Sequence, residues 1–199
     1  YNFYNNSLVT FPNNKVNDFA IYHEYVENGT YDRGNSRYNR NEAKKIIQLI
    51  KKHYDTTPKK SLGIIAFSIA QQKCIHEELE MFLFENPIYN KYINLEDNVD
   101  GFFIKNLETV QGDERDTILI SVGYGKDNEG NFSLNFGPLN KEGGEKRLNV
   151  AITRAKEKVV IVSSMLPTEI NENRTKSEGM ILLRRYMEYA NKKESSIVK

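Results

Sequence analysis

The stretch from Glu145 to Ser164, "EKRLNVAITRAKEKVVIVSS", changes from a charged helical pattern to an unbroken apolar run. Its last seven residues, "KVVIVSS", are rich in β-branched side chains without polar alternation, which is typical of a strand buried on both faces. A helix that runs directly into such a strand favours an α/β fold. At about 100° per residue the helical part forms one apolar stripe, made of Leu148, Ala151, Ile152 and Ala155.

Two basic residues border that stripe. Arg147 and Arg154 are seven positions apart and share one line at its edge. One interpretation is that both side chains extend along the margin of the core and hydrogen-bond carboxylates. The other is that Arg154 projects from the rim of the sheet toward a partner's phosphate, which a guanidinium recognises with two parallel hydrogen bonds. The helical pattern leaves both interpretations open.

The alternation of helices and buried strands continues along the chain. Amphipathic spacing predicts helices over 40–54, 70–84, 143–156 and 178–192. Short apolar runs predict strands over 61–68, 102–107, 117–125 and 158–164. A short alternating segment, 132–136, indicates an edge strand or hairpin inserted in this pattern. The sequence therefore predicts a three-layer α/β domain with a mostly parallel sheet flanked by helices.

Composition narrows the class of protein. The 199 residues suit one domain, and a net charge of +1 shows no general preference for polyanions, so any nucleic-acid contact must be local. The single cysteine, Cys74, excludes an internal disulfide, and no apolar run reaches the roughly 18 residues that span a bilayer. We expect a cytoplasmic protein without a membrane partner. The scattered residues His23, His53 and His76 indicate surface or capping positions, not a metal site.

Two other stretches carry polar residues at the ends of predicted strands. Ser68 and Gln71 have the spacing of a helix capping box, which is the simpler interpretation of that pair. Residues 109–114, "TVQGDE", turn at Gly112, and we expect them at the carboxyl end of a strand, where open α/β sheets bind ligands. An ordinary polar turn is the alternative.

Taken in order, three stretches resemble motifs IV, V and VI of superfamily 1 helicases. They are "GIIAFSIAQQ", "NLETVQGDERDTILIS" and "GPLNKEGGEKRLNVAITRAKEKVVIVSS". The resemblance is to the 5′-to-3′ branch that includes Upf1-like and Dna2-like enzymes, and most of all to its large bacterial members. The resemblance covers most of the chain. In addition to the three motifs, "FYNNSLVTFP" near the N-terminus matches the segment that usually follows motif III. Ala66 departs from the pattern, since many relatives have Thr there.

This resemblance implies that residues 1–199 form the second, C-terminal RecA-like domain of a P-loop-NTPase-type motor. The sequence has neither a GxxxxGK[ST] phosphate loop nor an acidic magnesium-binding strand motif. We therefore expect an N-terminally truncated fragment of a larger helicase, inactive as an ATPase alone. ATP and Mg²⁺ would be bound mainly by the first RecA-like domain of the same polypeptide.

The resemblance also assigns roles to individual residues. Arg154 matches the arginine finger that reaches the γ-phosphate, and Glu114 matches a glutamate near the nucleotide sugar. Arg154 would be the catalytic residue, and the nucleotide-binding residues would be Glu114, Gln111, Gly112 and Arg147. Single-stranded nucleic acid, with DNA favoured over RNA, would be contacted by Thr109, Ser68 and Gln71.

Two rival functions come from other classes. A non-catalytic nucleic-acid-binding or scaffolding module could retain a degenerate helicase fold, but the arginine of "AITRA" argues against such decay. A nuclease would need paired carboxylates and a lysine at metal-site spacing, and the sequence shows no convincing cluster of that kind.

Overall fold

The computed structural model describes residues 20–93 and 101–197. Its centre is a parallel sheet of five strands in the order β1-β5-β4-β2-β3. The strands are β1 (Ala20–Tyr25), β2 (Leu62–Ala66), β3 (Phe103–Asn106), β4 (Arg115–Ser121) and β5 (Ala155–Ser163). Because all five are parallel, their carboxyl ends meet at one edge of the sheet and their amino ends at the opposite edge.

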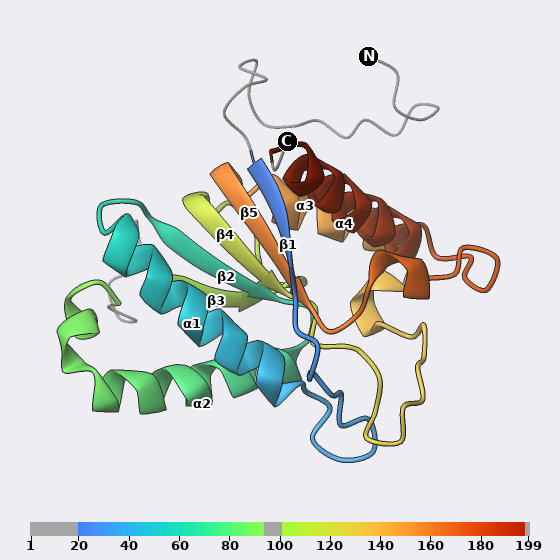
Figure 1. The fold of residues 1–199 in the computed structure, drawn as a ribbon, viewed down its shortest axis with the longest axis horizontal. Helices are drawn as coiled ribbons and strands as arrows, with labels where there is room; N and C mark the ends of the chain where they lie inside the picture. Colours follow the sequence, from blue (N-terminus) through green and yellow to red (C-terminus); the bar gives the residue numbers. More distant parts are fainter. Residues whose placement is uncertain (1–19, 94–100, 198–199) are drawn as a thin grey trace.

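Four α-helices cover the two faces of the sheet (Figure 1). Helices α1 and α2 lie on one face, and α3 and α4 lie on the other. Their bounds are α1 (Arg40–Thr56), α2 (Ile69–Glu85), α3 (Gly144–Ile152) and α4 (Glu178–Ile197). Three short 3-10 helices lie in the connections, η1 (Pro87–Lys91), η2 (Gly137–Leu139) and η3 (Pro167–Glu169). The predicted three-layer α/β fold is confirmed, and the arrangement is that of a RecA-like domain.

The sheet is covered on both sides because its strands carry apolar residues on both faces. In β4, Leu119 packs in the core under α1 and α2, whereas its neighbour Ile120 packs in the core under α3 and α4. The same division separates Val160 from Ile161 in β5. Successive side chains of a strand point to opposite faces, so a strand without polar alternation needs two apolar layers.

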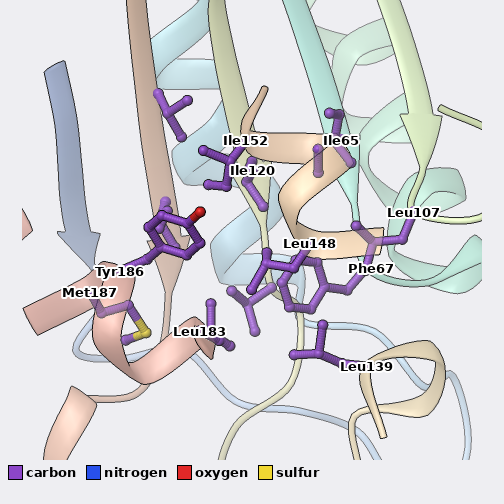
Figure 2. Close-up of a cluster of buried hydrophobic side chains, with 14 of the residues drawn as sticks. Ile65, Phe67, Leu107, Ile120, Leu139, Leu148, Ile152, Leu183, Tyr186 and Met187 are labelled. Atoms are coloured by element: carbon purple, nitrogen blue, oxygen red, sulfur yellow. The ribbon is translucent and has the colours of Figure 1, made fainter. Parts of the chain in front are cut away.

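The core under α3 and α4 lies close to the carboxyl ends of the central strands. Phe67, which directly follows β2, is fully buried there and lies near Leu139 and Leu148 (Figure 2). At the entry to α3 the backbone is close-packed, because a Cβ on Gly144 would lie 2.1 Å from the carbonyl oxygen of Leu139. This packing fixes the start of α3 against η2.

The structure corrects three expectations about elements. Strand β1 was not predicted. Helix α3 ends at Ile152, four residues before the predicted end, because the chain joins the sheet at Ala155. The alternating segment 132–136 forms no strand, and its pairing is a single antiparallel bridge between Lys126 and Phe132.

Two further expectations concern the N-terminal stretch and segments that could span a membrane. The N-terminal stretch "FYNNSLVTFP" lies outside the described residues. Within residues 20–93 and 101–197, none of the helices combines the length and the apolar character needed to cross a bilayer.

Candidate functional site

The sequence-predicted site residues separate into groups at opposite edges of the sheet. Ser68 and Thr109 follow the carboxyl ends of β2 and β3, whereas Glu114 and Arg154 immediately precede the amino ends of β4 and β5. At about 3.3 Å per residue, the seven residues of β4 place the two edges roughly 20 Å apart. The domain therefore presents two surfaces, one at each end of its strands.

At the amino edge the structure brings Glu114 and Arg154 together. The backbone N–H of Arg115 donates to the carbonyl oxygen of Arg154 over 2.9 Å, so the peptide that follows Glu114 lies beside Arg154. The side chain of Arg154 is half-buried, and that of Glu114 is exposed. Arg154 donates from Nε to the Val150 carbonyl over 3.2 Å and from Nη2 to the Thr153 hydroxyl over 3.5 Å.

The charge of Arg154 has no carboxylate partner within 4.0 Å in the part of the chain that the structure describes. Its position also differs from the predicted one, because it lies in the link between α3 and β5 and not on the helix. A guanidinium in this setting retains its attraction for an external anion.

Arg147 lies elsewhere. It is in the first turns of α3, where Nη1 donates to the carbonyl oxygens of Glu142 over 2.9 Å and of Pro138 over 3.4 Å. Its side chain reaches back to the connection before α3, whereas Arg154 lies in the link after α3, so the structure does not bring the two arginines together. Like Arg154, it bonds backbone oxygens, so the expectation that both arginines hydrogen-bond carboxylates is not met among the described residues.

Residues 107–114 link the two edges. Because β3 and β4 both run parallel to β2, this segment must return from the carboxyl edge to the amino edge. The predicted turn at Gly112 is confirmed by its φ of +78°, and both Gln111 and Gly112 are exposed. The turn lies on the return path, however, and not in a crevice directly at the end of β3.

The carboxyl edge carries two hydroxyl groups at neighbouring strand ends. Ser68 is the N-cap of α2, where Oγ accepts from the backbone N–H of Gln71 over 3.1 Å. Thr109 is exposed, and its Oγ1 bonds the backbone of Asn106 at distances of 3.2 and 3.3 Å. The Asn106 side chain also donates to Gln72 of α2 over 2.8 Å. This bond ties the end of β3 to the start of α2, so the two hydroxyl groups have a fixed relation.

Gln71 must be reassigned. Its side chain is fully buried, with Oε1 accepting from the Asn39 N–H over 2.8 Å. Its Nε2 donates to the Asn39 carbonyl and to the Ser121 hydroxyl, each over 3.0 Å. The start of α1 covers this amide, so Gln71 neither completes a reciprocal cap with Ser68 nor reaches a nucleic acid in this arrangement. It positions the start of α2 against α1 and β4.

Glu42 is a site residue that the sequence does not single out. This fully buried carboxylate in the first turn of α1 joins the two connections that leave β4 and β5. Oε2 accepts from the Gly123 N–H over 2.6 Å and from the Ser121 hydroxyl over 3.1 Å. Oε1 accepts from the Ser164 N–H over 2.8 Å and from the Ser164 hydroxyl over 2.7 Å. One side chain thus holds three segments of the carboxyl edge in place.

A local signal for Glu42 did exist. Asn39 is the N-cap of α1 and accepts from the Glu42 N–H over 3.1 Å, which is half of a capping box. Glu42 also precedes Ala43 and Ile46 on the buried face. Four of the five donors to its carboxylate lie about 80 to 120 residues along the chain, so sequence spacing reveals only the fifth, the Asn39 side-chain amide at 3.5 Å.

Glu42 gives stability a distinctive pH dependence. Burial raises its pKa from 4.5 to about 7, against the opposing effect of its hydrogen bonds. A carboxyl group whose pKa is higher in the folded state binds more protons when folded, so the free energy of unfolding falls as pH rises from about 4.5 to about 7. Across this window we expect the chain to lose roughly 2 to 3 kcal/mol relative to Glu42→Gln, as measured by urea unfolding.

The comparison with Glu42→Gln isolates this titration. The buried residues His23 and His53 have lowered pKa values and titrate in both proteins, so their contributions cancel. Parallel pH profiles for the two proteins would show that Glu42 does not titrate in this range.

The histidines do not form a site. His23 and His53 are buried, so of the two expected positions, surface or capping, the surface is wrong for both. The ring of His23 bonds Ser163 over 2.8 Å, and that of His53, in the last turn of α1, bonds the Lys60 carbonyl over 2.8 Å. Among the residues described, no group of three or more His, Cys, Asp and Glu side chains is arranged to hold a metal ion.

The chain matches a known protein family. A family model described as an AAA domain matches residues 4–166. The chain is 36% identical over 195 residues to an uncharacterized ATP-dependent helicase of Mycoplasma pneumoniae, covering 94% of the chain and 16% of that protein. It is 34% identical over 203 residues to an uncharacterized ATP-dependent helicase of Mycoplasma genitalium, covering 92% of the chain and 17% of that protein. The chain thus spans about a sixth of the length of these relatives.

Among solved structures, the C-terminal domain of a possible DNA helicase from Lactobacillus plantarum aligns with a TM-score of 0.43 and 11% identity. The alignment covers 73% of each chain.

Proposed function

The chain belongs to the AAA domain family, and from this premise we propose that it is the C-terminal motor domain of an ATP-dependent helicase. We place it in the 5′-to-3′ branch of superfamily 1, because its motifs resemble that branch. The names of the two Mycoplasma relatives support a helicase. One observation carries the proposal: the backbones at Arg154 and Glu114 lie side by side at one edge of the sheet. The half-buried side chain of Arg154 has no carboxylate partner among the described residues.

The amino edge suits the role of a second domain that closes on a bound nucleotide. Arg154 would donate to the γ-phosphate and stabilise the negative charge of the transition state. The exposed carboxylate of Glu114 would accept from a ribose hydroxyl, and Gln111 and Gly112 would shape the adjoining segment. ATP and Mg²⁺ would be held mainly by the first RecA-like domain of the same polypeptide, and the metal would neutralise phosphate charge there.

The carboxyl edge suits contact with a single strand. The hydroxyl groups of Ser68 and Thr109 would contact phosphates without reading base identity. Gln71 and Glu42 would act only indirectly, by positioning the elements that carry this surface. We propose single-stranded DNA as the partner, in preference to RNA, and the cytoplasm as the location.

Hydrolysis assays with and without the rest of the polypeptide test this proposal. The 199-residue chain alone is expected to show no appreciable ATP hydrolysis, because its sequence has no phosphate loop. The complete polypeptide is expected to hydrolyse ATP faster when single-stranded DNA is added. A complete polypeptide that binds DNA but never hydrolyses ATP would instead favour the non-catalytic binding module.

Glu114 provides a more specific prediction. In the complete polypeptide, Glu114→Ala should raise the KM for ATP about tenfold and leave kcat within a few-fold, because a charge-assisted hydrogen bond to the substrate is lost. Glu108→Ala is the matched control, since Glu108 is exposed in the same connection and forms only a long 3.8 Å ion pair with Lys141. Equal KM values for the two variants would contradict the role of Glu114.

A further inference from the structure

A groove of about 460 Å³ lies at the carboxyl edge of the sheet, beside the start of α2. Three segments border it: the connection from β1 to α1, residues 68–70, and the connection from β4 to α3. Only Ser68, the N-cap of α2, belongs to the residues that the motifs single out. The other residues that shape the groove lie outside those candidates.

The two long connections pack against each other to form one wall, and Figure 1 shows them side by side. The Tyr31 N–H donates to the Lys126 carbonyl over 2.8 Å. The rings of Tyr31 and Tyr124 lie 5.2 Å apart at 52°, and Tyr124 stacks on Phe136 at 4.9 Å. Tyr31 is half-buried at the outer end of this aromatic row. The wall therefore presents one ring in a fixed position to the groove.

The groove is positively charged. Arg33 and Arg37 line it, and none of the described residues that line it is acidic. Arg33 is 3.9 Å from Asp127, whereas Arg37 forms no ion pair within the described part of the chain. Arg40, close by in sequence, is neutralised by two glutamates of α2. Of the two arginines that line the groove, Arg37 is therefore the one available to an anionic ligand.

A tight turn holds Arg37 beside the groove. Its φ is +58°, a left-handed conformation that costs a non-glycine residue roughly 1 kcal/mol or more. The Arg37 N–H donates to the Asp32 carbonyl over 2.8 Å. The Asp32 carboxylate accepts from the N–H of Ser36 over 3.0 Å and from its hydroxyl over 2.7 Å. These bonds offset the strain and also engage the nearest carboxylate within its own turn.

We propose that this groove binds single-stranded nucleic acid, with Arg37 contacting a phosphate and the ring of Tyr31 stacking on a base. The N-terminus of the 17-residue helix α2 adds positive potential on the same side. Cations combined with an aromatic ring are typical of single-strand binding that does not depend on sequence. The inference rests on the proposed function, and it extends the strand contact from Ser68 to Arg37 and Tyr31, which lie outside the quoted motifs.

The charge of Arg37 is tested with Arg37→Gln and Arg37→Lys, which share the backbone strain of the native residue. Binding of a fluorescent oligothymidylate to the complete polypeptide is measured by anisotropy at several salt concentrations. Arg37→Gln should weaken binding several-fold at low salt and reduce the slope of log K against log salt by about 0.7, the value for one phosphate contact with a single strand. Arg37→Lys should retain the native slope.

The stacking role is tested with Tyr31→Leu and Tyr31→Phe. Tyr31→Leu removes the ring and should weaken oligothymidylate binding roughly tenfold or more, with an unchanged salt slope, since stacking releases no counterions. Tyr31→Phe retains the ring and should bind within about twofold of the native protein. Urea unfolding of each variant controls for loss of the fold.

The outcomes separate this inference from the proposed function. Basal ATP hydrolysis should be native in every groove variant, because the groove lies at the edge opposite Arg154. If Arg37→Gln and Tyr31→Leu bind oligothymidylate with native affinity and slope while DNA still stimulates the native enzyme, the groove assignment is wrong and the motor assignment stands. If DNA binds through the groove but never stimulates hydrolysis, the motor assignment fails and the groove remains.

Discussion

Replacing Arg154 with alanine in the complete polypeptide is expected to lower kcat for ATP hydrolysis by about 10³-fold or more, or roughly 4 kcal/mol at the transition state. The expected loss is large because the guanidinium would act on charge that develops only as the γ-phosphate is transferred. The fold should survive, since Arg154 is half-buried and its bonds within the domain go to one carbonyl and one hydroxyl of its own turn. Single-strand binding should survive as well, because Ser68 and Thr109 lie at the opposite edge.

Two further variants distinguish a catalytic arginine from a residue that only lines the rim. Arg154→Lys should restore little activity, because an ammonium group is a point charge and cannot replace the planar guanidinium. Arg174→Ala removes an exposed arginine from the connection between β5 and α4, and it should hydrolyse ATP at the native rate. If Arg154→Ala hydrolyses ATP within a few-fold of the native enzyme, Arg154 is not the finger and its role is packing at the rim.

Phe67→Ala is expected to have the largest effect on stability, a loss of about 3 to 5 kcal/mol in the free energy of unfolding. Phe67 is fully buried and lies with Leu107, Leu139 and Leu148 between the sheet and α3 (Figure 2). Removing the ring would leave a cavity that the close backbone contact at Gly144 prevents α3 from filling. Urea unfolding of the 199-residue chain gives the difference directly.

Phe84→Ala is the matched control for this measurement. Phe84 lies near the end of α2 with 88% of its surface exposed, so the same substitution there should change stability by less than about 0.5 kcal/mol. Similar losses for the two variants would mean that Phe67 does not occupy the tightly packed position described above.

The pattern of the sequence predicts most of the layers but not all of the strands. Strand β2 and the later halves of β4 and β5 are continuous apolar runs because both of their faces are covered, and such runs are readily recognised. Strand β1 reads "AIYHEY" and lies at the edge of the sheet, where its alternate residues are less buried. This alternation is also compatible with an irregular segment, so only the pairing with β5 identifies the strand.

The candidate site was predictable where it depends on short stretches of sequence. The motif resemblance singled out Glu114 and Arg154, and the structure brings them to one edge. Gln71 was assigned wrongly because its surroundings come from α1 and β4, which are distant in sequence. The end of α3 was misplaced because the pairing of Ala155 with Arg115 takes the chain into the sheet before the helical pattern ends.

The central claim, that this domain supplies an arginine to a nucleotide bound by a partner domain, is tested most directly by a structure of the complete polypeptide. The crystals would contain single-stranded DNA, ADP and aluminium fluoride as a mimic of the transferred phosphate. The proposal predicts the Arg154 guanidinium about 3 Å from the fluoride, released from the Val150 carbonyl, with Glu114 beside the ribose. A bound nucleotide with Arg154 still turned to Val150 and no group of this domain near the fluoride would contradict it.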